Sequence, residues 1–591
     1  MKMSNASRGA PMRFNRRLVS VLVTTATWLV GLSMVLVHGG EIIQPVEAQD
    51  LSVIGEWSAP QAWPVTAVHD HMLPTGKVLF WGYSDEAWLW DPATASLTPA
   101  APAGFNIFCA GHSFLPDGRL LVTGGHIANG VGLPNAAAYD PASNSWVRFP
   151  NMNAGRWYPT NTTLANGDIL VVSGDIDTTQ GVNRLPQVWQ GATGGWRDLT
   201  SAQLALPLYP FMHLAPDGRV FASGPSQITR YLDTSGSGSW SVVANSSHDG
   251  YRDYGSSVLY DDGKVLIVGG GDPPTNTAEV IDLNASTPAW RPVTPMTYNR
   301  RQINATLLPD ATVLVTGGGS LPGFDNAAGA VYAGELWDPV AETWTTVASF
   351  TKYRGYHSFT LLLPDGRVLS GGGDGNQDAE VYSPGYLFKG ARPVITSAPS
   401  IVTYGQPFFV GTTDASQISR VSLMRLSSVT HAFNMEQRIN RLGFSPATDG
   451  LNVVGPTNAN LSPPGYYMLF ILNGSGAPSV ATIVRLDAAP SEPPAAPSGL
   501  AATSKSASRI DLNWTDGAAN EDGFRIERCR GVICADADFA QIAQTGPNTT
   551  TYSDMGLDAL TAYKYRVRAF NGAGNSGYSN TASAITLIAV P

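Results

Sequence analysis

Cysteine is almost absent from this chain, with three residues in 591, so a disulfide-rich scaffold is excluded. Charge is also sparse, because only 14% of the residues are charged and the formal net charge is −10. No cluster of lysine and arginine is present, which argues against a nucleic-acid partner. The chain is rich instead in turn formers, with 62 glycines and 42 prolines. This composition favours an all-β protein of several domains over a helical one.

The first 48 residues have the outline of a signal peptide. Arg13, Arg16 and Arg17 precede an apolar run from 18 to 37, and the small residue Ala48 follows in VEAQD, where cleavage is expected. The run is also long enough to span a bilayer, so an uncleaved membrane anchor is the alternative. Both interpretations predict a secreted or cell-surface protein.

Export determines how the three cysteines are interpreted, because thiols in an oxidising compartment tend to be paired or used. Cys529 and Cys534 are five residues apart in ERCRGVICAD and are suitably spaced for a small disulfide. Cys109, in NIFCAGHS, is left without a partner.

Seven copies of a strand, a tight turn and a second strand recur along the chain, among them LPTGKVLFWG at 73, LPDGRLLVTGG at 115 and LPDGRVLSGGG at 363. Their turn positions are 76, 118, 167, 218, 263, 311 and 366. Between copies a polar turn is followed by tryptophan, as in YDPASNSW at 139 and WDPVAETW at 337, which indicates a second hairpin in each period. These periods resemble kelch repeats and predict a seven-bladed β-propeller over residues 51–388.

Two further domains are expected after the propeller. Residues 389–486 contain short alternating strands without the repeat, which indicates a β-sandwich. Residues 487–499 form a Pro/Ala-rich linker. Residues 500–588, with Trp514 and a candidate tyrosine corner at Tyr563, resemble a fibronectin type III module. The predicted fold class is therefore all-β: a seven-bladed kelch propeller followed by two Ig-like sandwiches.

Equivalent positions of successive blades form a ring about a propeller's axis, so the repeat can locate neighbours. The positions nine residues before each turn are Ala67, Cys109, Tyr158, Tyr209, Tyr254, Gln302 and His357. A thiol, phenols and an imidazole at one mouth of the disc indicate a metal site. Imidazole and oxygen ligands in an open arrangement suit copper(II), whose charge would favour a deprotonated tyrosine.

Five ordered motifs resemble the copper-radical oxidases, a family that includes galactose oxidase and glyoxal oxidase. They are FCAGHSFLPDG, RWYPT, YHSFTLLLPDGRVLSGGG, THAFNMEQR and PPGYYMLFILN, and the resemblance covers residues 51–486. RWYPT is more similar to the glyoxal oxidase branch. The resemblance implies oxidation of a small aldehyde or primary alcohol, with reduction of O2 to H2O2.

The resemblance also implies the site residues. Cys109 and Tyr158 would be joined by a thioether that carries a tyrosyl radical, and one copper ion would be bound by Tyr158, Tyr356, His357 and His431. Tyr356 would be the axial ligand and the general base. The pattern departs in one respect, because the stretch that carries a shielding tryptophan in galactose oxidase is SGDIDTTQG here, at 173–181, without an aromatic residue. Trp157 is the candidate replacement.

Two alternatives remain open at this stage. His69 and His71 in AVHDHML point to one side of a strand, so they are rival metal ligands should His431 not bind. The second alternative is a non-catalytic propeller that binds carbohydrate, with the C-terminal module contacting cell-surface polysaccharide. A sialidase-like hydrolase ranks below both because its Asp-box repeats are missing.

Overall fold

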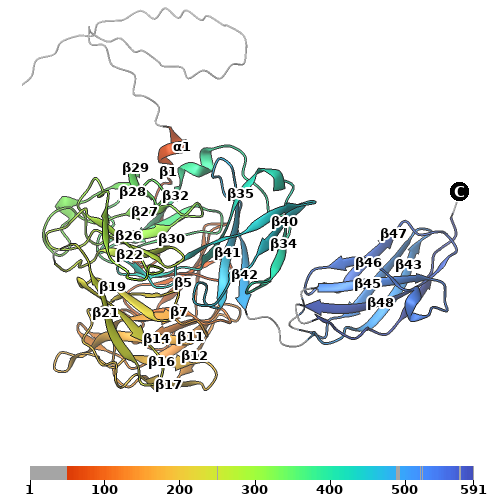
Figure 1. Ribbon diagram of the computed structural model, residues 1–591, viewed down its shortest axis with the longest axis horizontal. Coiled ribbons are helices and arrows are strands. Elements are labelled where there is room, and N and C mark those ends of the chain that lie inside the picture. Colours follow the sequence, from red (N-terminus) through yellow and green to blue (C-terminus); the bar gives the residue numbers. More distant parts are fainter. Residues whose placement is uncertain are drawn as a thin grey trace, which may run out of the picture. The chain divides into compact units, whose positions relative to one another are not determined.

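The computed structural model describes residues 50–248, 250–487, 493–518, 521, 523–571 and 574–589. The predicted signal peptide or anchor and residues 488–492 of the predicted linker lie outside this part. The described chain consists mainly of strands (Figure 1), which confirms the all-β prediction. Its helices are α1 (Leu51–Ile54), η1 (Ala327–Gly329), η2 (Gly385–Phe388), η3 (Ala415–Gln417) and η4 (Asp536–Asp538). None of them is long and apolar enough to cross a membrane.

Seven antiparallel sheets follow one another within described residues 56–383, and each begins with an inner strand just ahead of a predicted turn. The first three are β3 (His69–Met72), β4 (Val78–Trp81), β5 (Ala87–Asp91) and β6 (Ser96–Pro99); β7 (Gly111–Phe114), β8 (Leu120–Thr123), β11 (Ala136–Asp140) and β12 (Ser145–Phe149); and β13 (Trp157–Thr163), β14 (Ile169–Asp177), β16 (Gln187–Gln190) and β17 (Gly195–Asp198). Short strands β9 (His126–Ala128), β10 (Val131–Gly132) and β15 (Gly181–Val182) accompany them.

The remaining four sheets repeat the pattern. They are β18 (Phe211–Leu214), β19 (Val220–Gly224), β20 (Ile228–Asp233) and β21 (Ser239–Asn245); β22 (Ser256–Asp261), β23 (Lys264–Val268), β24 (Ala278–Asp282) and β25 (Arg291–Val293); β26 (Asn304–Leu307), β27 (Val313–Thr316), β28 (Ala333–Asp338) and β29 (Thr343–Ser349); and β30 (Ser358–Leu362), β31 (Val368–Gly372) and β32 (Asp378–Ser383), completed by β1 (Glu56–Trp57) and β2 (Gln61–Ala62). The pairing of β1 with β32 joins the beginning of this region to its end.

Neighbouring inner strands contact one another from β7 through β13, β18, β22, β26 and β30 to β3. Each sheet thus lies between two neighbouring sheets, which is why second strands such as β4 (VLFW) and β8 (LLVT) are buried along their whole length. The Asp-Gly turns require a left-handed residue, as at Gly118 with φ of 90°, and Ala311 adopts φ of 71° in the sixth copy. On this architecture we retain the predicted seven blades and the boundaries 51–388, 389–486 and 500–588 as a proposal.

Strands between residues 401 and 487 form two sheets that pack around one apolar cluster. One contains β33 (Ile401–Thr403), β42 (Thr482–Asp487), β41 (Gly465–Asn473), β35 (Ile418–Arg425) and β38 (Ile439–Leu442), and the other β34 (Pro407–Gly411), β40 (Gly450–Val454) and β39 (Phe444–Ala447). A hairpin of β36 (Ser428–Thr430) and β37 (Phe433–Asn434) leaves them and pairs with β3 of the first sheet, with Thr430 opposite His69 and Ser428 opposite His71.

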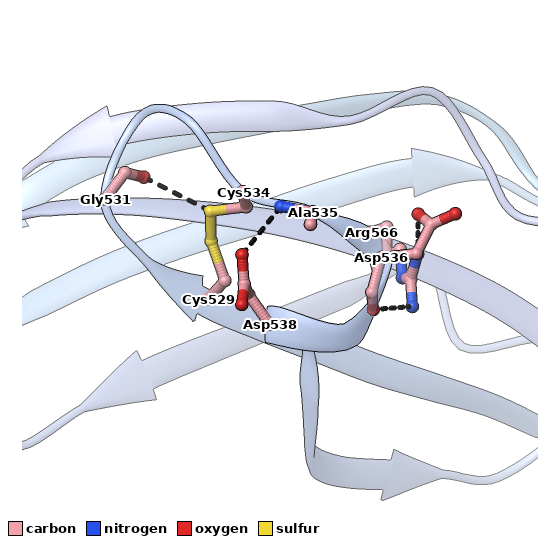
Figure 2. Close-up of a disulfide and its surroundings, with 7 residues drawn as sticks. All are labelled: Cys529, Gly531, Cys534, Ala535, Asp536, Asp538 and Arg566. Atoms are coloured by element: carbon pink, nitrogen blue, oxygen red, sulfur yellow. Dashed lines mark hydrogen bonds and ion pairs between the residues drawn. A yellow bond between two sulfur atoms is a disulfide. The ribbon is translucent and has the colours of Figure 1, made fainter.

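The C-terminal strands form two more sheets, β43 (Ser498–Ser506), β44 (Arg509–Thr515) and β47 (Thr551–Met555), and β46 (Ala540–Thr545), β45 (Gly523–Arg530), β48 (Ala562–Asn571), β49 (Gly574–Asn575) and β50 (Ala582–Ile585). Trp514 is buried between them, and the Tyr563 hydroxyl accepts the backbone N–H of Asp558 in the manner of a tyrosine corner. Cys529 and Cys534 form a disulfide at the end of β45 (Figure 2).

A buried arginine recurs in four of the seven sheets, where it joins the second strand to the third. Arg252 pairs with Glu279 at 2.6 Å, Arg300 with Glu335 at 2.7 Å and Arg354 with Glu380 at 2.9 Å. The remaining copy has Arg156 with the neutral Gln187 at 3.5 Å. Each arginine also donates to a carbonyl oxygen near the end of the second strand, as Arg300 does to Gly317 at 3.2 Å. These contacts fix the segment that precedes each inner strand.

Replacing one of these glutamates tests the scaffold. In Glu335→Ala the Arg300 guanidinium is left buried without a counter-charge, so the free energy of unfolding is expected to fall by about 3–5 kcal/mol. Glu335→Gln is the matched control, because it reproduces the arrangement that Arg156 and Gln187 already have, and it should lose less. Urea denaturation followed by tryptophan fluorescence measures both. Equal stability of the two variants would contradict this account.

Candidate metal centre

The ring of positions predicted from the repeat shares an unusual backbone conformation. Six of its seven residues have positive φ although none is glycine: Cys109 (63°), Tyr158 (69°), Tyr209 (43°), Tyr254 (51°), Gln302 (59°) and His357 (64°). This left-handed region is costly for residues with a Cβ atom and persists where the surrounding structure enforces it. The repeated conformation occurs at or just before the start of the inner strand, and Tyr158, Tyr209, Tyr254 and His357 line one cavity at a mouth of the sheet ring.

Four of the predicted ligands converge at a cavity of about 610 Å³ at this mouth, which Tyr158, Tyr356, His357 and His431 all line. The Tyr158 hydroxyl makes a short contact with the Tyr356 hydroxyl and lies 2.9 Å from His431 Nε2. The rings of Tyr356 and His357 are 3.7 Å apart between centroids, and those of His357 and His431 are 4.6 Å apart. His431 comes from the β36–β37 hairpin, more than seventy residues after His357 in the sequence.

Both imidazoles direct Nε2 toward the cavity. His357 Nδ1 lies 2.6 Å from Asp374 Oδ1, so Nδ1–H donates to the carboxylate and Nε2 keeps its lone pair. Within the described chain, the buried His357 Nε2 has no hydrogen-bond partner. The His431 ring is held by Thr430, whose Oγ1 lies 2.6 Å from His431 Nδ1 while its hydroxyl donates to the Val68 carbonyl oxygen.

Burial disfavours the charged forms of Tyr158, Tyr356 and His431. It raises the pKa of the Tyr158 and Tyr356 phenols far above their ordinary value and lowers the pKa of His431 well below its own. A phenolate would form here only beside a cation. Among the described residues, no three side chains of His, Cys, Asp or Glu are grouped as a metal site, so a metal at this mouth needs the tyrosine oxygens. Two imidazole nitrogens with phenol oxygens fit copper(II).

Cys109 lies against Tyr158. It is completely buried in the same apolar cluster, and its carbonyl oxygen accepts the Tyr158 backbone N–H at 2.9 Å. The Tyr158 ring is covered on both sides, by Trp157 at a centroid distance of 3.8 Å and an interplanar angle of 10°, and by Tyr209 at 4.6 Å and 26°. Trp157 Nε1–H donates to His126 Nδ1 at 3.1 Å. Trp157 therefore supplies the aromatic cover that residues 173–181 lack.

The rival histidines are engaged elsewhere. His69 Nε2 accepts the backbone N–H of Cys109 at 3.0 Å, and His69 Nδ1 lies 3.2 Å from His112 Nε2. His71 Nδ1 lies 2.9 Å from Ser428 Oγ. The two side chains do point to one side of β3, as the alternation predicts, but neither lines the cavity. The structure therefore places them behind Cys109 and not among the residues that face the mouth.

The other cavity walls are mainly aromatic, with Tyr83, Phe108 and Phe324 among them. Asp253 is the one carboxylate in the described lining, and it pairs with the buried Arg301 at 2.5 Å. No lysine or arginine lines the described cavity.

Sequence reasoning missed Asp374, Thr430, His126 and His112. Of these, Asp374 follows the GGG of the seventh repeat and His112 lies within FCAGHS, but no spacing marks either as a partner.

Family models match four parts of the chain: glyoxal oxidase N-terminus over residues 86–228, kelch motif over 254–297, galactose oxidase-like early set domain over 392–486, and fibronectin type III domain over 495–585. The second of these regions lies within the repeats and the third contains His431. The predicted resemblances to kelch repeats and to a fibronectin type III module are thereby confirmed.

Similar proteins agree with these matches. A galactose oxidase of Gibberella zeae is 29% identical over 494 residues, covering 73% of this chain and 71% of the relative. An aldehyde oxidase GLOX of Vitis pseudoreticulata is 29% identical over 439 residues, covering 64% and 82%. The solved structure of a fungal alcohol oxidase in complex with copper is 27% identical, with a TM-score of 0.67, over 73% of this chain and 99% of that one. These findings confirm the resemblance: the chain is similar to the copper-radical oxidases of the galactose oxidase and glyoxal oxidase type, and its relatives support a copper oxidase.

Proposed function

We propose that this protein is an extracellular mononuclear copper-radical oxidase that oxidises a glyoxal-type aldehyde or a primary alcohol and reduces O2 to H2O2. The observation that carries the proposal is the convergence of two phenols and two Nε2 atoms at one mouth, with the Tyr158 hydroxyl in contact with both Tyr356 and His431. Relatives named galactose oxidase and aldehyde oxidase support the same chemistry.

Tyr158, Tyr356, His357 and His431 would hold the copper ion. Bound copper would supply a one-electron couple and a positive charge that stabilises the phenolate. The protein's part is to fix both Nε2 lone pairs, which Asp374 and Thr430 do through the opposite ring nitrogens. Burial of the site excludes bulk water from the reacting groups.

A second one-electron store is needed because an alcohol loses two electrons. We assign this role to Tyr158, joined through its ring to the Cys109 sulfur. A sulfur substituent makes the ring electron-richer and easier to oxidise to a radical. Trp157 and Tyr209, which cover both faces of the ring, support this assignment because they shield it from solvent.

Tyr356 Oη is the proposed general base that accepts the proton of the substrate hydroxyl. The oxidised Tyr158 then takes a hydrogen atom from the adjacent carbon. In the overall reaction RCH2OH and O2 give RCHO and H2O2, and a hydrated aldehyde RCH(OH)2 gives the acid RCOOH in the same way. The aromatic cavity without a cationic side chain in its described lining supports a small uncharged substrate.

A non-catalytic propeller that binds carbohydrate is the second candidate, favoured by the aromatic lining of the cavity. The fibronectin type III module would then contact cell-surface polysaccharide. This candidate predicts a wild-type protein that releases no H2O2 with any aldehyde or alcohol.

Substitution of the proposed redox pair tests the function. Cys109→Ser and Tyr158→Phe should abolish H2O2 release from methylglyoxal or benzyl alcohol in a coupled peroxidase assay, because neither variant can form the thioether. Tyr356→Phe should retain copper but lose activity by about 10²–10⁴-fold, since it lacks the base. Tyr231→Phe, outside the cavity, is the control. Wild-type turnover in Cys109→Ser would refute the assignment.

The carboxylate behind His357 gives a separate prediction. Asp374→Asn removes the anionic acceptor that fixes the His357 tautomer, so copper(II) affinity should fall by about 10–100-fold in competition titrations with a chelator. Tyr83→Phe is the matched control, because Tyr83 donates to the same Asp374 oxygen at 2.6 Å and the variant leaves the His357–Asp374 bond in place. Its affinity should stay close to that of the wild type. Unchanged affinity in Asp374→Asn would contradict the role of this carboxylate.

A further inference from the structure

Three imidazoles and one hydroxyl form a buried chain of hydrogen bonds behind the proposed copper site. His69 and His71 come from β3, His112 from β7 and Ser428 from β36, and none of their side chains is exposed to solvent. They are not among the residues that line the cavity. Buried polar groups of this kind are costly unless each donor meets an acceptor, so the direction of every bond can be worked out.

The series of hydrogen bonds begins at the backbone of Cys109. Its backbone N–H donates to His69 Nε2, so this nitrogen carries no proton and His69 Nδ1–H donates to His112 Nε2. His112 therefore carries its proton on Nδ1 and donates to Ser428 Oγ at 2.6 Å. The Ser428 hydroxyl is left to donate to His71 Nδ1 at 2.9 Å. Every bond runs in one direction, and the series ends at His71, whose Nε2 has no hydrogen-bond partner within the described residues.

This series of hydrogen bonds connects Cys109 with the hairpin that carries His431. At one end, Cys109 is held in the left-handed region with φ of 63°, and its peptide is fixed on both sides. Its N–H donates to His69, and its carbonyl oxygen accepts the N–H of Tyr158. Toward the other end, Ser428 lies in β36, two residues before Thr430 in the hairpin that delivers His431. An apolar residue in place of His69 would leave the Cys109 N–H without its acceptor.

We propose that His69, supported by His112 and Ser428, is a positioning residue that holds Cys109 for its covalent coupling to Tyr158. This inference rests on the proposed function, which supplies the coupling. In that step the Cys109 S–H and a ring C–H of Tyr158 are replaced by one C–S bond. The two hydrogens and two electrons that are released pass to O2 and give H2O2. The imidazole chain takes up no proton in this step and acts only through the position of the Cys109 backbone.

The experiment measures the rate of thioether formation in the full chain. Purified metal-free protein is mixed with copper(II) and O2, stopped at intervals with chelator and acid, alkylated and digested. The fraction of Cys109 joined to the Tyr158 peptide, two hydrogens lighter, is read by mass spectrometry. His69→Phe should form the thioether at least 10-fold more slowly than the wild type. His69→Gln should restore most of the rate, because its Oε1 reaches the place of Nε2 and accepts the Cys109 N–H.

Ser428→Ala is the second variant, chosen because it removes a hydroxyl without enlarging a side chain. It breaks the chain between His112 and His71 and should also slow the coupling. His213→Phe is the matched control: His213 is a buried histidine bonded to Ser257 at 2.9 Å, and among the described residues it makes no hydrogen bond to His69, His71, His112 or Ser428. It should couple at the wild-type rate. Copper affinity should stay within about twofold of the wild type in all four variants, since none of these residues is a proposed ligand.

The outcomes separate the two proposals. If the wild type itself forms no thioether, the proposed function fails. If the wild type couples and His69→Phe and Ser428→Ala couple equally fast, the positioning role is wrong while the function stands. Loss of copper binding in both His69→Phe and His69→Gln would also overturn it, because His69 would then be a ligand. Slow coupling in His69→Phe with recovery in His69→Gln is the predicted result.

Discussion

The pairing of β36 with β3 is the contact on which the whole site depends. It inserts a hairpin from beyond the sheet ring beside the first inner strand, with Thr430 opposite His69. His431 is thereby brought within 2.9 Å of the Tyr158 hydroxyl, although the two residues are 273 positions apart in the sequence. Without this pairing the ring of inner strands offers only one imidazole, His357, at the mouth. The site is a property of the ring and the hairpin together.

A rigid surrounding is what allows the ring residues to keep their strained backbone. Cys109, Tyr158 and His357 all have positive φ, which isolated residues of these types avoid. The buried arginines of the repeat, such as Arg156 and Arg354, lie two or three residues before the ring positions and bind the neighbouring strands. The same elements thus supply stability and hold the reacting side chains in place. Preorganisation of this kind is expected where chemistry requires fixed distances.

The positions around the mouth could be predicted from the sequence, because equivalent residues of successive repeats occupy equivalent places in the fold. The turn glycines located the ring positions, and the structure places Tyr158 and His357 at one cavity as that register predicts. His431 could be identified only through the resemblance of THAFNMEQR to a known family, since no local pattern connects it to the ring. Asp374, His126 and Ser428 could not be found, because no characteristic spacing marks their contacts, whether the partner is 17 residues away, as His357 is from Asp374, or 316, as His112 is from Ser428. His69 and His71 illustrate the limit: alternation predicted their common direction but not the partners, Cys109 at His69 Nε2 and Ser428 at His71 Nδ1.

We propose that two tyrosines and two histidines at this mouth hold a single copper ion. Anomalous diffraction at the copper absorption edge, on crystals of the copper-loaded protein, tests it most directly. We expect one strong peak in the cavity, within bonding distance of His357 Nε2, His431 Nε2 and the Tyr158 hydroxyl oxygen. A peak at His69 and His71, or none in the cavity of a protein that binds copper in solution, would contradict it.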